Sequence, residues 1–445
     1  MTKYPMFLEQ QAFDILKEFS FPRLGGTDKE KAAAAIIRRY LASAGLKSVE
    51  ETFTVQTYQE MTALVEVLSP YRKKYQVAVT GNTGSTPDKG TKGELVHLTA
   101  FDTDSLDSVK GKIVITYCAL TKVIYQKLLQ KNIKALIRVT EPVAALRHLK
   151  QNDLFSKAFG KINSVMIGYE DALEMIHQNA QTVNVISRQK EFKAQSRNII
   201  ATVKGTELPN ERIIICGHYD SVNKTAGCLD NAAGSATIAD FARYFAANPP
   251  KRTITFIWFG SEELGLKGSW AYTERHKKEL MPPKPPILLN TPVTKLVINV
   301  DVAGTIFGNN GAVICGSETM ANFIDSFAKE KGLQLSTHHS AYSSDNIPFN
   351  EKGIPSIAFN RSSSNYGHTP MDNIKLISPE GLKVMGQFGL ELVNRIVNSV
   401  DIPFELSIPE PDKKSAHEYV ERANPFYRHL SQEDLLRESQ RGKRP

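Results

Sequence analysis

Four short runs of apolar residues constrain the fold of this chain most. They are IIIC, TITFIWF, KLVINV and PSIAF, at residues 213–216, 253–259, 295–300 and 355–359. Continuous runs of this length are typical of strands that are buried on both faces of a sheet. Segments with helical periodicity lie between and after them, at residues 231–247, 318–331 and 379–398. This alternation predicts an α/β fold with a mostly parallel or mixed central sheet flanked by helices.

The residue pattern also divides the chain into four predicted regions. Residues 1–69 contain a helix over 27–45, which opens with Thr27 and Glu30 at capping-box spacing, and an alternating strand over 51–69. A Gly- and Ser-rich loop then leads into strand–helix–strand order, which predicts a smaller α/β insert domain over residues 70–194. The main domain is expected over residues 195–400. A Pro-rich C-terminal extension is expected over residues 401–445.

The charge balance and the hydrophobic content argue against several classes of protein. The 55 basic and 47 acidic residues give a formal charge of +8. No basic block interleaved with aromatic residues accompanies this charge, so no nucleic-acid partner is expected. No apolar run approaches the roughly 20 residues of a membrane helix, and the first 20 residues do not resemble a secretory signal. The four scattered cysteines fit reduced thiols. We therefore expect a soluble cytoplasmic protein, with a homo-oligomer left open.

Polar and acidic residues follow directly after the predicted strands. His218 follows the first run, Glu262 and Glu263 follow the second, and Asp301 follows the third. Because the carboxyl ends of parallel strands meet at one edge of a sheet, these side chains are expected in one crevice. Imidazole and carboxylate groups are zinc ligands, and two zinc ions roughly 3.5 to 4 Å apart need a bridging carboxylate. The strand ends therefore predict a zinc site.

Adjacent residues suggest how this site divides its chemistry. Asp220 stands two residues after His218, a spacing that lets its carboxylate orient the imidazole. Of the neighbouring Glu262 and Glu263, one can bind metal while the other takes a proton from metal-bound water.

Two further candidates depend on this set. Asp230, in CLDNAAG just before a predicted helix, is placed either to cap that helix or to bridge two ions, and beside the other candidates we favour bridging. His368, in NYGHTPMDN, is a loop histidine whose case as a ligand rests on the other residues.

The motifs around these residues resemble, as a set, the co-catalytic zinc aminopeptidases related to glutamate carboxypeptidase and the transferrin receptor. The matching segments occur in the family's order over residues 195–400: GHYDSV, LDNAAGSA, WFGSEELGLKGS, NVDVAG, SDNIPFNEKGIPSIAF and GHTPMDN. The resemblance implies a catalytic zinc-peptidase domain with two zinc ions, for which cobalt or manganese are alternatives. It assigns His218 and Asp301 to one ion, Glu263 and His368 to the other, Asp230 to both, and Glu262 as the general base. It also implies a non-proline cis peptide after Asp230, and the insert over 70–194 looks like a protease-associated domain.

The sequence departs from the family pattern where the ends of the substrate are held. Members often have an Arg before the Ser-Asp-His of the segment written SSDN here, whereas this chain has Ser343 and, for the His, Asn346. Many members also have a Tyr directly before the final His, where it steadies the oxyanion, but here Gly367 intervenes. The candidate substrate-binding residues are accordingly Arg361, Tyr366 and Asp345.

Three functions fit this sequence. The leading one is a zinc-dependent aminopeptidase, in which Glu262 activates a metal-bridged water that hydrolyses the N-terminal bond of a peptide substrate. The second is a carboxypeptidase or dipeptidase with the same metal centre, for which Arg361 is the nearby cation that could hold a terminal carboxylate. The third is a non-catalytic binding protein of the same fold, which loss of ligands would mark, yet every expected ligand is present.

Overall fold

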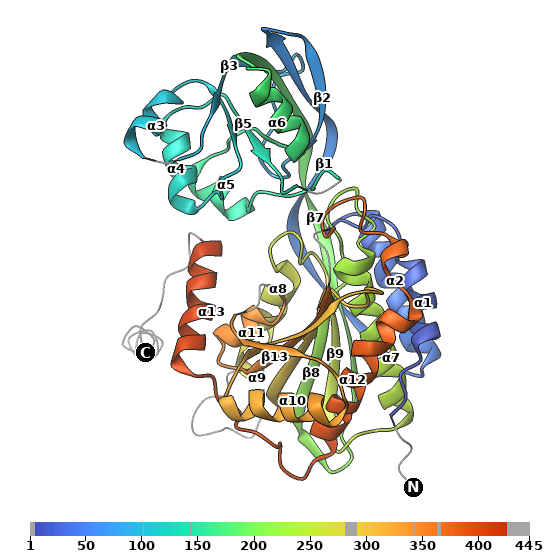
Figure 1. Cartoon of the computed structure of the whole chain (residues 1–445). Helices are drawn as coiled ribbons and strands as arrows, with labels where there is room; N and C mark the ends of the chain where they lie inside the picture. The colour runs from blue at the N-terminus through green and yellow to red at the C-terminus, as the bar shows by residue number, and fades with distance from the viewer. Residues whose placement is uncertain are drawn as a thin grey trace, which may run out of the picture.

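The computed structural model describes residues 5–100, 102–142, 145–280, 292–341, 344–362 and 366–424. Figure 1 shows two lobes, a larger one that contains both ends of the described chain and a smaller one formed by the insert. Two strands, β1 (Ser48–Ser69) and β7 (Thr182–Val203), run through both lobes. No helix of the described residues is long and apolar enough to cross a membrane.

The sheet of the larger lobe contains the four predicted buried strands. β9 (Arg252–Phe259), β8 (Leu208–His218), β10 (Val293–Val300) and β13 (Ser356–Ser362) are consecutive parallel neighbours. The antiparallel neighbours β7 and β11 (Asn309–Cys315) flank them, and β12 (Ser336–His339) lies at the edge. The predicted α/β fold with a mixed central sheet is therefore confirmed.

Helices cover both faces of this sheet, which explains why its central strands are apolar throughout. Alternate residues of β8 and β9, such as Ile213 and Phe256, join one core with the helices of the first face. These helices are α1 (Glu9–Glu18), α2 (Asp28–Ser43), α7 (Ala233–Ala247), α10 (Glu318–Glu330) and α12 (Pro379–Asn398). The intervening residues, such as Ile214 and Ile257, pack on the other face. There they meet α8 (Lys267–Arg275), α9 (Lys277–Leu280) and α11 (Ile347–Glu351).

The smaller lobe has its own sheet and cores. Its strands are β2 (Lys73–Val79), β6 (Ser164–Ile167), β5 (Ala135–Val139), β4 (Ile113–Thr116) and β3 (Thr91–His97), in this spatial order. Its helices are α3 (Thr103–Ser108), α4 (Lys122–Gln130), α5 (Asp153–Phe159) and α6 (Tyr169–His177). Separate apolar clusters lie on the two faces of this sheet. The insert therefore has the α/β character that the sequence predicts.

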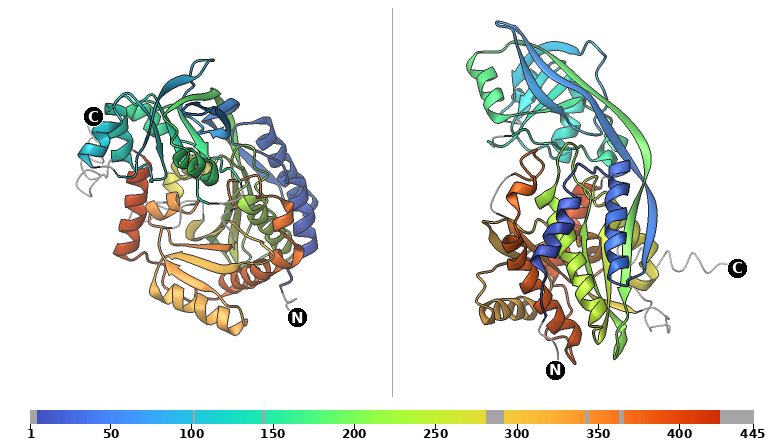
Figure 2. Two further views of the ribbon diagram at one scale, coloured as in Figure 1. Left: turned by 45° about the horizontal axis from the view of Figure 1, so that its top comes forward. Right: turned by 90° about the vertical axis from the view of Figure 1, so that its right-hand side faces the viewer.

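Strands β1 and β7 join the lobes without a break. They pair antiparallel from Ser48 opposite Ala201 to Ser69 opposite Thr182, and Figure 2 shows them side by side along the molecule. One end of β7 pairs with β3 of the insert and the other with β9 of the larger lobe. The boundary predicted at residue 194 consequently falls inside β7, because one strand serves both lobes.

The C-terminal extension forms a helix against the larger lobe. α13 (Glu410–Ala423) places Val420 against Leu266 and Ile347. Its last residue, Ala423, accepts a hydrogen bond through its carbonyl oxygen from the side-chain amide of Asn152 in the insert. This helix therefore contacts both lobes.

Candidate metal centre

The register of the parallel strands brings the predicted ligands to one edge of the sheet. His218, the last residue of β8, pairs with Phe259, the last residue of β9. In the next pairings Asn299 lies opposite Cys216, and Val300 lies opposite Phe359. Glu262, Glu263 and Asp301 closely follow these strand ends. The crevice that the sequence predicts is thus formed by the ends of aligned strands.

Five side chains form two candidate metal sites that share one residue. The first comprises His218, Asp230 and Asp301, and the second comprises Asp230, Glu263 and His368. Within each site the potential ligand atoms all lie within 4.8 Å of one another. The structure brings together all five ligands predicted from the sequence.

The two oxygens of Asp230 face the two imidazoles. The His218 Nε2 atom lies 3.1 Å from Asp230 Oδ1 and 3.3 Å from Asp301 Oδ1. The His368 Nε2 atom lies 3.2 Å from Asp230 Oδ2 and 3.3 Å from Glu263 Oε2. This is the arrangement that a carboxylate shared by two ions requires.

Asp230 does not act as a helix cap. It lies in the turn η1 (Cys228–Ala232) before α7, and its side chain makes no capping hydrogen bond at the start of η1 or at the start of α7. The cap-like contact belongs to Asn231, whose Oδ1 accepts from the Gly234 N–H at 3.0 Å. The peptide bond between Asp230 and Asn231 is cis, which confirms the expectation from the family resemblance.

A carboxylate from the last motif holds the main chain of this turn. Asp372 accepts the N–H of Leu229 through Oδ1 at 2.6 Å and the N–H of Asp230 through Oδ2 at 3.1 Å. Burial, which outweighs these hydrogen bonds, raises the pKa of Asp372 to about 7. Nothing in the sequence beyond its place in GHTPMDN indicates this role of Asp372.

The electrostatics of the cluster fit a cation. Burial lowers the pKa of His218, but the charges of Asp301 and Glu262 outweigh it and raise this pKa well above its usual value. Burial opposes ionisation of Asp230, yet its hydrogen bonds with both imidazoles hold its pKa well below the usual range. Among the described residues, Glu263 Oε1 and Asp301 Oδ1 are buried without a hydrogen-bond donor. Buried carboxylate oxygens and imidazoles of this kind are a zinc donor set.

Glu262 lies beside this cluster but belongs to neither metal site. Burial raises its pKa well above the usual value, and the neighbouring carboxylates of Glu263, Asp345 and Asp301 add to the effect while His218 opposes it. A carboxylate with a raised pKa beside a metal site is suited to accept and return a proton.

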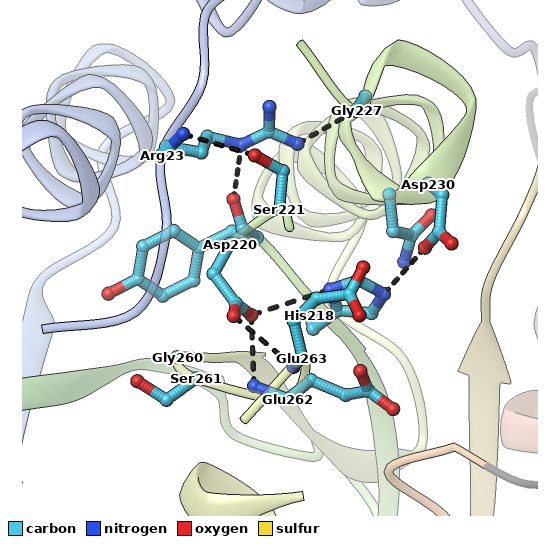
Figure 3. Close-up of polar contacts among 12 residues, drawn as sticks. Arg23, His218, Asp220, Ser221, Gly227, Asp230, Gly260, Ser261, Glu262 and Glu263 are labelled. Carbon is cyan, nitrogen blue, oxygen red and sulfur yellow. Dashed lines mark hydrogen bonds and ion pairs between the residues drawn. The ribbon is translucent and has the colours of Figure 1, made fainter. Parts of the chain in front are cut away.

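Asp220 connects the base to the first imidazole (Figure 3). Its Oδ1 lies 3.4 Å from His218 Nδ1, a long contact in the predicted orienting position. The same carboxylate accepts the main-chain N–H groups of Glu262 at 2.9 Å and Glu263 at 3.2 Å. Asp220 therefore positions three functional residues, two more than its spacing to His218 suggested.

Arg23, which belongs to none of the sequence motifs, anchors the loop between His218 and Asp230. Its buried guanidinium donates to the carbonyl oxygens of Tyr219, Ala226 and Gly227, and its main-chain N–H donates to Ser221 Oγ at 3.0 Å. Only contacts across the fold reveal this role, because Arg23 lies about two hundred residues before the loop that it holds.

The predicted substrate-binding residues have different surroundings. Arg361 is 8% exposed, and its guanidinium donates to the carbonyl oxygens of Thr305, Ile306 and Gly308 and to Asn310 Oδ1. These bonds give Arg361 a structural role, so it offers no free cation for a terminal carboxylate. The structure therefore corrects this assignment.

Asp345 is fully buried, which withholds it from direct contact with a substrate. Burial raises its pKa to about 7, and among charged neighbours His218 lowers this pKa while Asp301 raises it. Asp345 is thus a supporting group beneath the site. Tyr366 is half-buried in the loop of His368. The departure at Ser343 lies outside the described residues.

The insert touches the loop that carries His368. The main-chain N–H of His148 donates to the His368 carbonyl oxygen at 2.7 Å. Among its described residues the insert contains no cluster of potential metal ligands. Its contact with the His368 loop is made by a main-chain N–H group, so nothing in the sequence of the insert indicates it.

Comparisons with known proteins agree with this geometry. Residues 198–393, which contain all five candidate ligands, match the model of peptidase family M28. The match therefore places the candidate ligands in the part of the chain that resembles this family. The co-catalytic zinc peptidase family that the motifs resembled is thereby confirmed.

Similarity to known proteins extends beyond residues 198–393. Aminopeptidase YwaD of Bacillus subtilis is 26% identical over 405 residues, which are 85% of this chain and 83% of that protein. Carboxypeptidase Q of Mus musculus is 27% identical over 284 residues, which are 58% of this chain and 59% of that protein.

Solved structures share the fold. BSAP, a zinc aminopeptidase from Bacillus subtilis, superposes with a TM-score of 0.72 at 23% identity, covering 91% of this chain and 99% of its own. A peptidase M28 precursor from Shewanella amazonensis gives a TM-score of 0.75 at 22% identity, covering 91% and 98%. The arrangement of core and insert is thus present in both structures.

Proposed function

We propose that this M28 protein is a zinc-dependent aminopeptidase that holds two zinc ions and removes the N-terminal residue of peptides. The observation that carries the proposal is that Asp230 belongs to both candidate metal sites and faces an imidazole in each. Glu262 lies beside these sites and belongs to neither. His218 and Asp301 would hold one ion, and Glu263 and His368 the other. Zinc bound by these residues would polarise the scissile carbonyl and lower the pKa of water. Cobalt or manganese are alternatives for the same ligands.

The residues of this chain supply the proton transfers. Glu262 takes the proton of the attacking water and returns it to the leaving amine, for which its raised pKa is suited. Asp220 fixes the main chain of Glu262 and Glu263, so that base and ligand keep their positions during both transfers. The carboxylates of Glu262 and Asp301 are also candidates to receive the substrate ammonium.

Carboxypeptidase activity stays the alternative, because carboxypeptidase Q is among the similar proteins. The structure weakens its original basis, since the Arg361 guanidinium is engaged by main-chain oxygens. A non-catalytic protein is disfavoured because the complete ligand set is present. The protease-associated identity of the insert, the cytoplasmic location and a homo-oligomer stay predictions of the sequence.

Zinc analysis and assays with leucyl and N-acetyl-leucyl substrates test the proposal. We expect about two equivalents of zinc and hydrolysis of the free-amine substrate only. Glu262→Gln should keep both ions and lower kcat by several orders of magnitude, because it removes the base without removing a ligand. Glu94→Gln, an exposed position in the insert, is the matched control. Preference for the acetylated substrate, or near-normal turnover of zinc-loaded Glu262→Gln, would refute the assignment.

A further inference from the structure

One lysine of the insert, Lys150, stands near the metal centre and forms no ion pair with the acidic side chains that the structure describes. It follows His148, whose main-chain N–H contacts the carbonyl oxygen of the ligand His368. The segment is also fixed to the insert, because the Gly81 N–H donates to the Leu149 carbonyl at 3.0 Å and the Gln151 N–H donates to the Gly81 carbonyl at 2.7 Å. Lys150 is thus held on a short, well-anchored stretch of chain.

The side chain of Lys150 reaches the turn that follows the proposed base. Its Nζ atom lies 3.6 Å from the point that a Cβ atom on Gly265 would occupy. The Gly265 and Leu266 N–H groups donate to the Glu262 carbonyl oxygen at 2.7 and 2.8 Å, so this turn continues directly from the base. The ammonium therefore stands beside the turn that begins at Glu262, on the side where the insert faces the larger lobe.

Lys150 lines a cavity of about 450 Å³ formed by four parts of the chain. The insert contributes Lys150, the turn and α8 contribute Leu266 and Trp270, the end of α11 contributes Lys352, and the C-terminal helix contributes Tyr419 and Val420. Cavities between domains that combine apolar walls with a few charged groups are typical of ligand subsites.

The other lysines that line this cavity are already neutralised. Lys267 Nζ lies 2.6 Å from Asp153 Oδ1, and Lys352 Nζ lies 2.6 Å from a Glu274 oxygen. Lys150 has no such partner among the described acidic residues, although Glu262 and Glu263 are near enough to raise its pKa against the larger, lowering effect of burial. Lys150 is half-buried, and an ammonium that is partly withdrawn from water without a close counter-ion favours an incoming anion.

We propose that Lys150 is a specificity-determining residue that binds a carboxylate on the residue following the scissile bond. The inference rests on the proposed function, because Glu262 returns its proton to the leaving amine and that residue must therefore lie beside Glu262. The carboxylate is either the free C-terminus of a dipeptide or the side chain of an Asp or Glu in that position. The protein would accordingly favour substrates whose leaving residue is anionic.

Kinetics with four leucyl substrates test the assignment in the zinc-loaded full-length protein. Leu-Ala carries a main-chain carboxylate, Leu-Asp-NH2 carries a side-chain carboxylate, and Leu-Ala-NH2 and leucine p-nitroanilide carry neither. Lys150→Met should raise KM about tenfold or more for one of the two anionic substrates, because a charge-assisted contact is lost, and should leave both neutral substrates unchanged. Lys150→Arg should restore most of the loss. Lys157→Met, which removes the same charge from α5 without touching the cavity, is the matched control.

The substrate that is affected identifies the source of the carboxylate. Equal effects of Lys150→Met on all four substrates, or no effect on either anionic one, would overturn the assignment of Lys150. Failure of the wild-type protein to hydrolyse leucine p-nitroanilide or Leu-Ala-NH2 would instead count against the aminopeptidase proposal, since neither substrate depends on Lys150.

Discussion

At the scale of single residues, the chemistry of the site depends on a carboxylate that faces two imidazoles. Each Asp230 oxygen lies within 3.2 Å of a different Nε2 atom, from His218 and from His368. The Asp372 carboxylate holds the main-chain N–H groups of Leu229 and of Asp230 itself. Asp230 is therefore positioned as a shared ligand by its own backbone contacts as well as by the imidazoles.

Replacement of this carboxylate should remove both metal ions together. In Asp230→Ala each proposed ion loses a ligand, and the two positive charges lose the anion between them. We expect less than about half an equivalent of zinc after dialysis and no measurable peptidase activity. Asp14→Ala, an exposed change on α1, should retain both ions. If folded Asp230→Ala still binds two equivalents with wild-type affinity, Asp230 is not a bridging ligand.

The ligands could be predicted from the sequence because each follows an apolar run or lies in a motif of known order. Their supporting residues could not. Asp220 acts on main-chain N–H groups that lie 42 and 43 residues away, and Asp372 acts on groups 143 and 142 residues away. Nothing in the local sequence distinguishes such an acceptor from an exposed acid, since its partners carry no side-chain signature.

At the scale of elements, the buried strands were predictable and the strands that join the lobes were not. β8, β9, β10 and β13 each match a continuous apolar run. The alternating pattern over residues 51–69 predicts most of β1, but the middle of β7 contains SRQKEFKAQS, whose polarity hides a strand. Its pairing with β1 along the whole length supplies the order that its own residues do not indicate.

Helix α2 connects to the catalytic turn through a buried acid. Glu30 accepts hydrogen bonds from Ser196 Oγ at 2.5 Å, Ser261 Oγ at 3.2 Å and the Gly26 N–H at 2.7 Å. Burial, with the charge of Asp220 added, raises its pKa from 4.5 to about 8. The capping-box spacing predicts the main-chain contact with Thr27 but gives no sign that this carboxyl group reaches the residue before Glu262.

The raised pKa of Glu30 predicts a specific pH dependence of stability. Between about pH 4.5 and 8 the unfolded chain releases this proton while the folded chain keeps it, so the free energy of unfolding falls as pH rises. Urea unfolding of chelator-treated protein at about pH 5 and about pH 8 should show a decrease that is larger in the wild type than in Glu30→Gln, by on the order of 4 kcal/mol. Glu94→Gln should behave like the wild type, whereas an identical pH dependence in Glu30→Gln would show that Glu30 is ionised at neutral pH.

At the scale of the whole molecule, two separate regions meet at the metal centre. Residues 198–393 supply every candidate ligand, and the insert contacts the His368 loop through His148. Helix α13 connects the lobes, because it packs against Leu266 and Ile347 and receives a hydrogen bond from Asn152 of the insert. His368 itself has a positive φ of 62°, a sparsely populated backbone region for a residue other than glycine. A loop in this conformation depends on the contacts around it. The insert is therefore expected to support one metal site more than the other.

Removal of the insert tests this coupling. Glu60 and Gln189 lie opposite each other on β1 and β7, so a two-residue Asn-Gly turn can replace residues 61–188 and close the strands as a hairpin. At the site of His218 and Asp301, the shortened protein should bind zinc with the same affinity as the wild type. The ion proposed at Glu263 and His368 should bind about tenfold more weakly, because the His368 loop has lost its main-chain donor. Competition titration with a zinc-binding dye measures both affinities. His148→Ala in the full-length chain keeps that N–H group and should bind both ions normally. If circular dichroism shows the shortened protein to be folded and both affinities equal those of the wild type, the insert does not support the metal centre.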